Sequence, residues 1–319
     1  MKRRTLLAAA AAPLVFPARA ATRPIGWVSI EPPAAVAEFL TVFKSALPTA
    51  FPKGAEIPQV LDRYADANPA AVAERVKELQ AAGVSLIVSQ GGATPLVVRA
   101  QPSVPVVFAF SGDPVVANVV ESLARPGGNA TGMTFMAIEL NPKRIGLARE
   151  LLPGCRKVAL LSNRRHPGEE KEIAACQQAV QSLGIDMSAS RVETQAEALA
   201  AASEALDKGA QAVLALSSAG MLQHIAELSV LCGRHKVPLI GGWSMFCRRG
   251  ATLSYGPRLS DCFRRVAWYV ARVSGGAAPS TLPVELPTAF ELVVNKRAAT
   301  GMGLGLPATL LAQADEVIE

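Results

Sequence analysis

Hydrophobic and polar positions follow two alternating patterns along the chain from Pro24 onward. Short runs that are apolar throughout, such as IGWVSI (25–30) and VPVVFAF (104–110), are typical of strands buried on both faces of a sheet. Segments with apolar residues every three or four positions, such as AVAEFLTVFKSAL (35–47), predict amphipathic helices. Because strands and helices alternate, the pattern predicts a parallel sheet with helices on both faces.

The same alternation starts again near residue 156. RKVALLSN (156–163) predicts a strand, EEKEIAACQQAVQSLG (169–184) a helix, and AGMLQHIAELSVLCGRH (219–235) a further helix. The last part adds a short strand at TLSYG (252–256) and a helix at 259–276, followed by an extended segment with several prolines at 282–295. This order predicts a chain that crosses back to the first half and then returns to the second.

The predicted fold class is therefore α/β, with two Rossmann-like doubly wound lobes joined by a multi-strand hinge around a cleft. We expect lobe 1 to contain residues 21–135 and about 256–280. Lobe 2 is expected to contain residues 136–255 and about 281–319.

The segment FSGDPVVANVVESLARPGGNATGMT (110–134) carries the first candidate chemistry. It ends a strand, and its pattern predicts a short helix that begins near Pro114 and stops at the loop Pro126–Asn129. Ser111 or Asp113 would cap this helix. Ligands of open α/β sheets bind beyond the carboxyl ends of the strands, so the turn before Pro114 is a candidate binding site.

The N-terminal segment has the three parts of a secretory signal. Basic residues at 2–4 precede the apolar run Leu6–Phe16, and Ala18-Arg19-Ala20 forms a small-x-small cleavage site, which predicts a signal peptide at 1–20 and a periplasmic protein. The apolar run is too short to span a bilayer, which needs about 20 residues. The Arg3-Arg4 pair is also compatible with twin-arginine export.

Charge and cysteine content narrow the function further. The signal segment holds four of the six net positive charges and no acid, which leaves +2 for the mature chain and no basic stripe for nucleic acid. The five cysteines include no CxxC pair, so we expect no metal site and no cofactor, although export would permit a disulfide. The chain also lacks GxSxG, HExxH and P-loop motifs, which argues against an enzyme.

Several segments together resemble one family. They are VPVVFAF with GDPVVANVVESLARPGGNATGMT, the Ala-Thr-Pro turn at 93–95, LPVELPTAFELVVNKRAATGMGL and the tail PATLLAQADEVIE. This combination is similar to the TrpX-like ABC transporter substrate-binding proteins over nearly the whole mature chain. The resemblance implies a type I periplasmic binding fold, likewise without cofactor, that closes on a small molecule and delivers it, as a monomer, to an ABC permease and ATPase complex.

The resemblance also implies a set of ligand-binding residues at the ends of strands. They are Ser29, Gln90, Gly91, Thr94, Ser111, Asp113, Asn163, Ser218, Trp243 and Tyr255. Relatives often carry acidic residues in the loops that here read LSSAG and GGWSMF. Because those acids are absent here, a neutral, carboxylate-bearing or aromatic compound would suit the serine, threonine and tryptophan lining at least as well as an amino acid. Asp113 is the remaining candidate partner for a ligand cation.

Structural roles compete with binding at several of these positions. Asp113 and Thr94 would serve equally as helix caps, and Trp243 either covers a ligand or packs at the lobe edge. The Arg164–His166 segment reads as a solvated loop, although an arginine that reached the cleft would suit an anion. His224 and His235 flank a predicted helix, where solvent-facing positions are common.

Two other functions stay open at the level of sequence. A two-lobed binding protein would also serve as a ligand sensor that docks on a receptor or sensor kinase. An enzyme with an active site in the cleft is the third alternative, because catalytic groups need not be adjacent in sequence.

Overall fold

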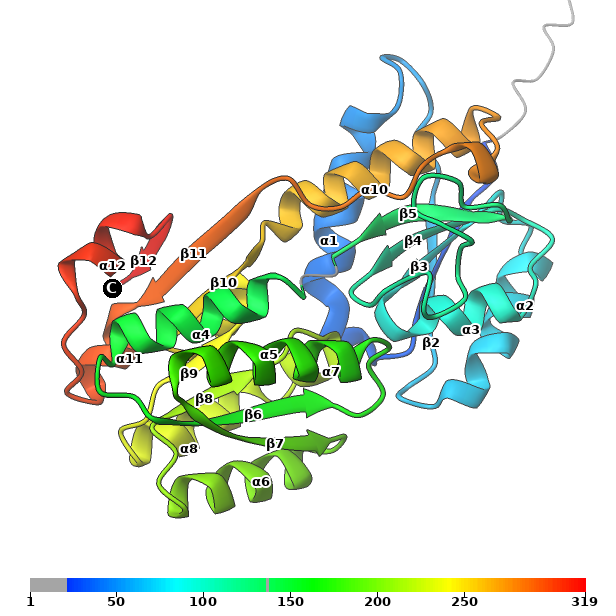
Figure 1. Ribbon diagram of the computed structural model, residues 1–319. Coiled ribbons are helices and arrows are strands. Elements are labelled where there is room, and N and C mark those ends of the chain that lie inside the picture. The colour runs from blue at the N-terminus through cyan, green and yellow to red at the C-terminus, as the bar shows by residue number, and fades with distance from the viewer. Residues whose placement is uncertain (1–21, 136–137) are drawn as a thin grey trace, which may run out of the picture.

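The computed structural model describes residues 22–135 and 138–319, so the predicted signal peptide lies outside the described part of the chain. Two α/β units lie side by side, each built on one mainly parallel sheet with helices on both faces (Figure 1). We call the unit with the five-stranded sheet lobe 1 and the unit with the seven-stranded sheet lobe 2. This architecture confirms the predicted fold class.

Lobe 1 contains only parallel strands, in the order β2-β1-β3-β4-β5. The strands are β1 (Ile25–Ser29), β2 (Val60–Tyr64), β3 (Ile87–Gln90), β4 (Val106–Phe110) and β5 (Ala130–Thr134). Its helices are α1 (Pro33–Ala50), α2 (Val72–Ala81), α3 (Thr94–Arg99) and α10 (Leu259–Ser274). Val107 packs in the cluster that contains α1 and α10, whereas Phe108 packs in the cluster of α2 and α3, so successive β4 side chains bury opposite faces of the sheet.

Lobe 2 has the strand order β12-β11-β10-β9-β8-β6-β7, in which only the β10–β11 pair is antiparallel. The strands are β6 (Lys157–Asn163), β7 (Asp186–Val192), β8 (Ala212–Ala215), β9 (Leu239–Gly241), β10 (Leu253–Pro257), β11 (Phe290–Asn295) and β12 (Glu316–Ile318). The helices are α4 (Leu140–Leu151), α5 (Glu169–Leu183), α6 (Gln195–Asp207), α7 (Ala219–Leu222), α8 (Ile225–Arg234), α9 (Ser244–Arg248), α11 (Lys296–Gly301) and α12 (Ala308–Gln313). The predicted single helix over 219–235 is thus two helices, separated at Gln223 and His224.

The chain passes between the lobes after β5, after β10 and before β11. β10 pairs with β9 in lobe 2, whereas α10, which follows directly, packs against α1 of lobe 1 (Figure 1). The chain then stays beside β5 through Glu285, whose N–H bonds the carbonyl of Gly132 at 3.2 Å. The return to lobe 2 therefore comes slightly later than the expected boundary near 281.

The predicted helix after Pro114 is wrong. Residues 111–129 form turns and irregular structure between β4 and β5. The Val119 N–H bonds the carbonyl of Pro114 at 2.8 Å, a wider turn than an α-helix makes, and Asn118 adopts a left-handed φ of +53°. This left-handed residue ends the turn before a second helical turn can form.

Neither cysteine pairing nor a membrane span appears in the described part. All five cysteines are buried and free, so the disulfide that export would permit does not form. Across residues 22–135 and 138–319, every helix is too short or too polar to cross a bilayer.

Candidate ligand-binding site between the lobes

A cavity of about 500 Å³ lies between the two sheets. Both lobes line it through segments that follow the carboxyl ends of β1, β2, β3, β4, β6, β7 and β8, where open α/β sheets bind their ligands. The lining residues are Ile30, Glu31, Ala67, Pro69, Gly92, Pro95, Leu96, Ser111, Asn163, Arg165, His166, Pro167, Glu193, Thr194, Ser218, Ala219, Gly220, Gln223 and His224. A second hollow, of about 590 Å³, lies on the surface beside α4 and α5, but only residues of lobe 2 line it.

Polar contacts bridge the two lobes around this cavity. Each joins a residue of lobe 1 to one of lobe 2: Ser111 Oγ to His166 Nε2 at 2.9 Å, Lys171 Nζ to Asp113 Oδ2 at 3.0 Å, Arg165 Nη1 to the Ala67 carbonyl at 2.8 Å, and Gln223 Nε2 to Glu31 Oε2 at 2.6 Å. The lobes are therefore closed on each other. Gly112 allows this approach, because a Cβ there would collide with the carbonyl oxygen of Pro167.

Three predicted site residues reach the cavity. Ser111, Asn163 and Ser218 all line it. Ser218 also caps α7 by accepting a hydrogen bond from the Met221 N–H at 3.0 Å. Whether any of the three binds ligand stays a prediction.

Four further predicted residues, Ser29, Gln90, Gly91 and Thr94, lie behind the cavity wall. Ser29 Oγ donates to Gln90 Oε1 at 3.0 Å and accepts from the N–H of Glu31 at 3.2 Å. Ser89 Oγ contacts Thr94 Oγ1 at 3.1 Å, and both side chains are fully buried. Through these contacts the group positions the loops that do line the cavity.

Asp113 lies at the rim, outside the cavity lining. Its Oδ1 accepts hydrogen bonds from the N–H groups of Val115 and Val116 at 2.9 and 3.1 Å, while Oδ2 pairs with Lys171. Burial opposes ionisation, but Lys171 and the two N–H groups outweigh it and hold the pKa of Asp113 below its usual value. These partners already occupy the carboxylate, so Glu31 and Glu193 supply the acidic groups of the cavity instead.

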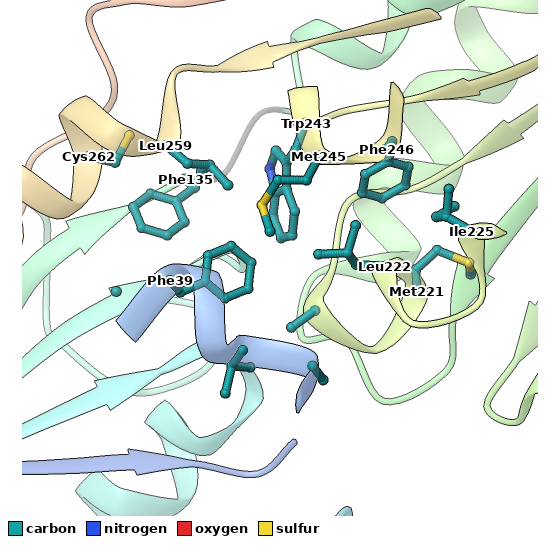
Figure 2. Packing of buried hydrophobic residues seen from close by; sticks show 14 of the residues in the cluster. Phe39, Phe135, Met221, Leu222, Ile225, Trp243, Met245, Phe246, Leu259 and Cys262 are labelled. Atoms are coloured by element: carbon teal, nitrogen blue, oxygen red, sulfur yellow. The ribbon is translucent and has the colours of Figure 1, made fainter. Parts of the chain in front are cut away.

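Trp243 lies in the core and Tyr255 packs, partly buried, against the core of lobe 2, so neither lines the cavity. The Trp243 ring is only 2% exposed and makes edge contacts with Phe39 of α1 and Phe246 of α9, with ring centroids 5.8 and 6.0 Å apart (Figure 2). Tyr255 stacks on Phe290 at 6.4 Å. The expected aromatic cover over a ligand is therefore wrong for Trp243, because packing between the lobes takes up its ring.

The β6–α5 loop contributes residues that sequence reasoning assigned to solvent. Arg165 forms an ion pair with Glu193, and His166 is buried with its Nδ1 3.6 Å from Glu172 Oε2. His224 also lines the cavity and is 9% exposed, contrary to the expected solvent-facing position. The sequence did hold one signal for these residues. Arg165 and His166 follow β6, and His224 follows the short helix α7 after β8, so all three lie at the carboxyl edge of the sheet.

A buried ionisable cluster lies under the lobe 2 side of the cavity. Burial lowers the pKa of His166 to about 4 and raises that of Glu172 to about 7, the latter against the attraction of Arg144. Burial also lowers the pKa of the Arg144 guanidinium to about 10. We therefore take the imidazole to be neutral at pH 7.

Burial acts on the carboxyl of Glu31 in the same direction as on that of Glu172. It raises the pKa of Glu31, although the hydrogen bond from Gln223 and the charge of Arg165 act in the opposite direction. Within the described ranges, no three His, Cys, Asp or Glu side chains are placed to hold a metal ion. The site is thus a cavity between the two lobes whose largely apolar lining carries a few ionisable groups.

A family model described as ABC transporter substrate binding protein matches residues 36–318. The chain belongs to this family. This result confirms the family resemblance seen in the sequence. Since this family consists of substrate-binding proteins, the chain is a binding protein and not an enzyme.

Solved structures and one curated relative agree with this assignment. The ABC domain in complex with L-Trp from Streptococcus pneumonia is 19% identical with a TM-score of 0.85, covering 93% of this substrate-binding protein and 100% of that chain. A conserved domain protein from Vibrio cholerae O1 biovar eltor is 23% identical with a TM-score of 0.84, covering 93% and 99%. A tyrosine-binding protein of Clostridioides difficile (strain R20291) is 20% identical over 62% of this chain, and the match spans 56% of that relative.

Proposed function

We propose that this protein, after export to the periplasm, captures a small molecule in the cavity between its lobes and delivers it to an ABC permease and ATPase complex as a monomer. The observation that supports this most is the cavity itself, since loops from the carboxyl ends of both sheets line it. A ligand that touches both lobes stabilises the closed form by its higher affinity for that form. Closure then presents a joint surface of both lobes to the permease.

The relatives suggest where to begin the search for a ligand. One is named as a tyrosine-binding protein and another was solved with L-Trp, so amino acids are the first candidates for this cavity. The cavity volume of about 500 Å³ lies within the usual range for small-molecule sites.

Thermal unfolding tests the binding function. The mature protein (21–319), unfolded and refolded to remove carried-over ligand, would be melted with amino acids, aromatic acids, short carboxylates, amines, nucleosides and sugars. A ligand at about 100 times its dissociation constant should add about 2.7 kcal/mol and raise Tm by several degrees. If neither the panel nor a cell extract shifts Tm, the binding function is contradicted.

Delivery needs its own measurement. Membrane vesicles that contain the permease and ATPase should accumulate the identified ligand only when this protein is supplied. Light scattering should give the mass of one chain. Accumulation that does not depend on the protein would argue against import.

A further inference from the structure

A further hollow, of about 380 Å³, lies in lobe 2 between α8 and α11, at the end of the lobe that points away from lobe 1 (Figure 1). Its lining includes Leu239, the first residue of β9, and Thr252, which directly precedes β10. The hollow therefore lies at the amino edge of the sheet, opposite the ligand cavity at the carboxyl edge. The two sets of lining residues have no member in common. We call this site the α8–α11 hollow.

Two arginines on different helices bring positive charge to the α8–α11 hollow. Arg234 lies in the last turn of α8 and Arg297 in the first turn of α11, and both line the hollow. Within residues 22–135 and 138–319, neither guanidinium forms an ion pair or a hydrogen bond. Lys236, in the turn between α8 and β9, is also exposed and has no ion pair in the described ranges.

Acidic groups of the protein do not balance this charge. The lining contains no aspartate or glutamate. Glu227, the acidic residue of α8, lies about two helical turns before Arg234 and forms no ion pair with it in the described structure. Glu319 is already paired with Lys296, the residue before Arg297, at 2.8 Å. The hollow thus offers hydrogen-bond donors to an anion without a competing carboxylate.

Most of the remaining lining is apolar. Val230, Val237 and Met302 contribute to it, and Val230 is 56% exposed, more than any other large hydrophobic residue in the described part of the chain. Gly233 and Gly301 keep the hollow open, since a Cβ at either position would meet no atom within 4 Å. Exposed apolar surface beside unpaired cations is typical of sites that bind molecules with an anionic head and an apolar chain.

We propose that the α8–α11 hollow binds an amphiphilic phosphate, a molecule with a phosphate group on an apolar chain. Arg234 and Arg297 would hold the phosphate, because a guanidinium donates two parallel hydrogen bonds to phosphate oxygens. Val230 would cover part of the apolar chain. A free organic phosphate and the headgroup of an anionic phospholipid share this chemistry. The site goes beyond the proposed transport function, since it belongs to lobe 2 alone.

Three probes test the site in the unmodified mature protein. Titration calorimetry would compare octyl phosphate, inorganic phosphate and octyl glucoside, which has the same chain and a neutral head. Octyl phosphate should bind saturably with a Kd of about 1 mM or below, and inorganic phosphate at least about 10-fold more weakly, because it lacks the chain. Equal affinity for octyl glucoside, or no saturable binding of octyl phosphate, would overturn the proposal.

Charge-removing variants assign the binding to the hollow. Arg234→Gln and Arg297→Gln should each weaken octyl phosphate binding about 10-fold. Arg125→Gln is the matched control, because Arg125 is an exposed arginine of lobe 1 whose guanidinium also makes no contact with the described residues, and it should leave the affinity unchanged. Octyl phosphate binding that persists unchanged in both α8 and α11 variants contradicts the site.

Vesicles distinguish the two sources of the phosphate. Co-sedimentation with phosphatidylglycerol vesicles, but not with phosphatidylcholine vesicles, should occur if the site takes a lipid headgroup, and both arginine variants should reduce it. Octyl phosphate binding without co-sedimentation assigns the site to a free organic phosphate. Co-sedimentation that both variants retain counts against the site. Ligand capture between the lobes is measured separately by the thermal shift of the panel, so either function can fail while the other stands.

Discussion

Asp113 is occupied on both carboxylate oxygens in the closed protein. One oxygen accepts the N–H groups of Val115 and Val116, and the other pairs with Lys171 of the opposite lobe. The first role belongs to the turn after β4 and lies wholly within lobe 1. The second role joins lobe 1 to lobe 2, so the two contributions can be measured apart.

Substitutions at Asp113 and Lys171 separate these roles. Asp113→Ala removes the turn acceptor and the ion pair, and should lower the free energy of unfolding by about 1 kcal/mol. Lys171→Ala removes only a partly exposed ion pair and should change it by less than about 0.5 kcal/mol. Urea unfolding of both variants checks this, and an equal loss in the two would show that the interlobe pair dominates.

The β6–α5 loop is the element that connects the cavity to the buried cluster of lobe 2. His166 in this loop contacts Ser111 of lobe 1 with Nε2 and faces Glu172 of α5 with Nδ1. Glu169 and Arg144 are the other charged groups that act on Glu172. Protonation in this cluster therefore bears on both the fold of lobe 2 and the contact between lobes.

The pH dependence of stability should reveal two opposing groups. The pKa of His166 falls from 6.5 to about 4 on folding, so its contribution is present above pH 6.5 and is lost on acidification. The pKa of Glu172 rises from 4.5 to about 7, so its contribution is present below pH 4.5 and is lost as pH rises to 7. Between pH 4.5 and 6.5 the two slopes largely cancel.

Removing one group should expose the slope of the other. In Glu172→Gln the free energy of unfolding should fall on acidification from pH 6.5 by up to about 1.4 kcal/mol per pH unit. In His166→Asn it should instead fall as pH rises from 4.5 to 7. Urea unfolding across pH 4.5–7.5 measures both, and parallel profiles for the wild type and the two variants would contradict the assignment.

At the scale of the whole molecule, the hydrophobic core continues from one lobe into the other. One cluster joins Phe39 of α1 with Trp243, Phe246 and Leu222 of lobe 2 (Figure 2). Phe263 of α10 belongs to the same cluster. The segment that crosses after β10 leads directly into α10, whose residues Leu259 and Phe263 belong to this cluster. Apolar packing therefore joins the two lobes beside this crossing. Trp243 is its largest side chain from lobe 2.

Trp243→Ala should therefore act on stability. Loss of this buried ring should lower the free energy of unfolding by about 3–5 kcal/mol, while ligand affinity measured well below Tm is retained. Trp268→Ala is the matched control, since Trp268 is only partly buried beside Arg265 on α10, and its loss should cost less. A variant at Trp243 with normal stability and lost affinity would restore the role of ligand cover.

The sequence by itself determined the elements and the order of the fold. Apolar runs such as 104–110 and amphipathic segments such as 35–47 record burial directly, because each position must match its local environment. The edge of the sheets at which the cavity lies followed from the parallel strands, and the family resemblance placed Ser111, Asn163 and Ser218 at that edge. The helix expected after Pro114 failed because Asn118 adopts a left-handed conformation that periodicity does not encode.

Only the tertiary structure decided which strand-end residues face the cavity. Trp243 and Tyr255 follow or lie in strands as the cavity residues do, yet their rings pack with Phe39, Phe246 and Phe290. Glu31 of lobe 1 meets Gln223 of lobe 2, and Arg165 of lobe 2 reaches the carbonyl of Ala67 in lobe 1. Such relations join residues far apart in the chain, and they arise from how the two lobes close rather than from any local pattern.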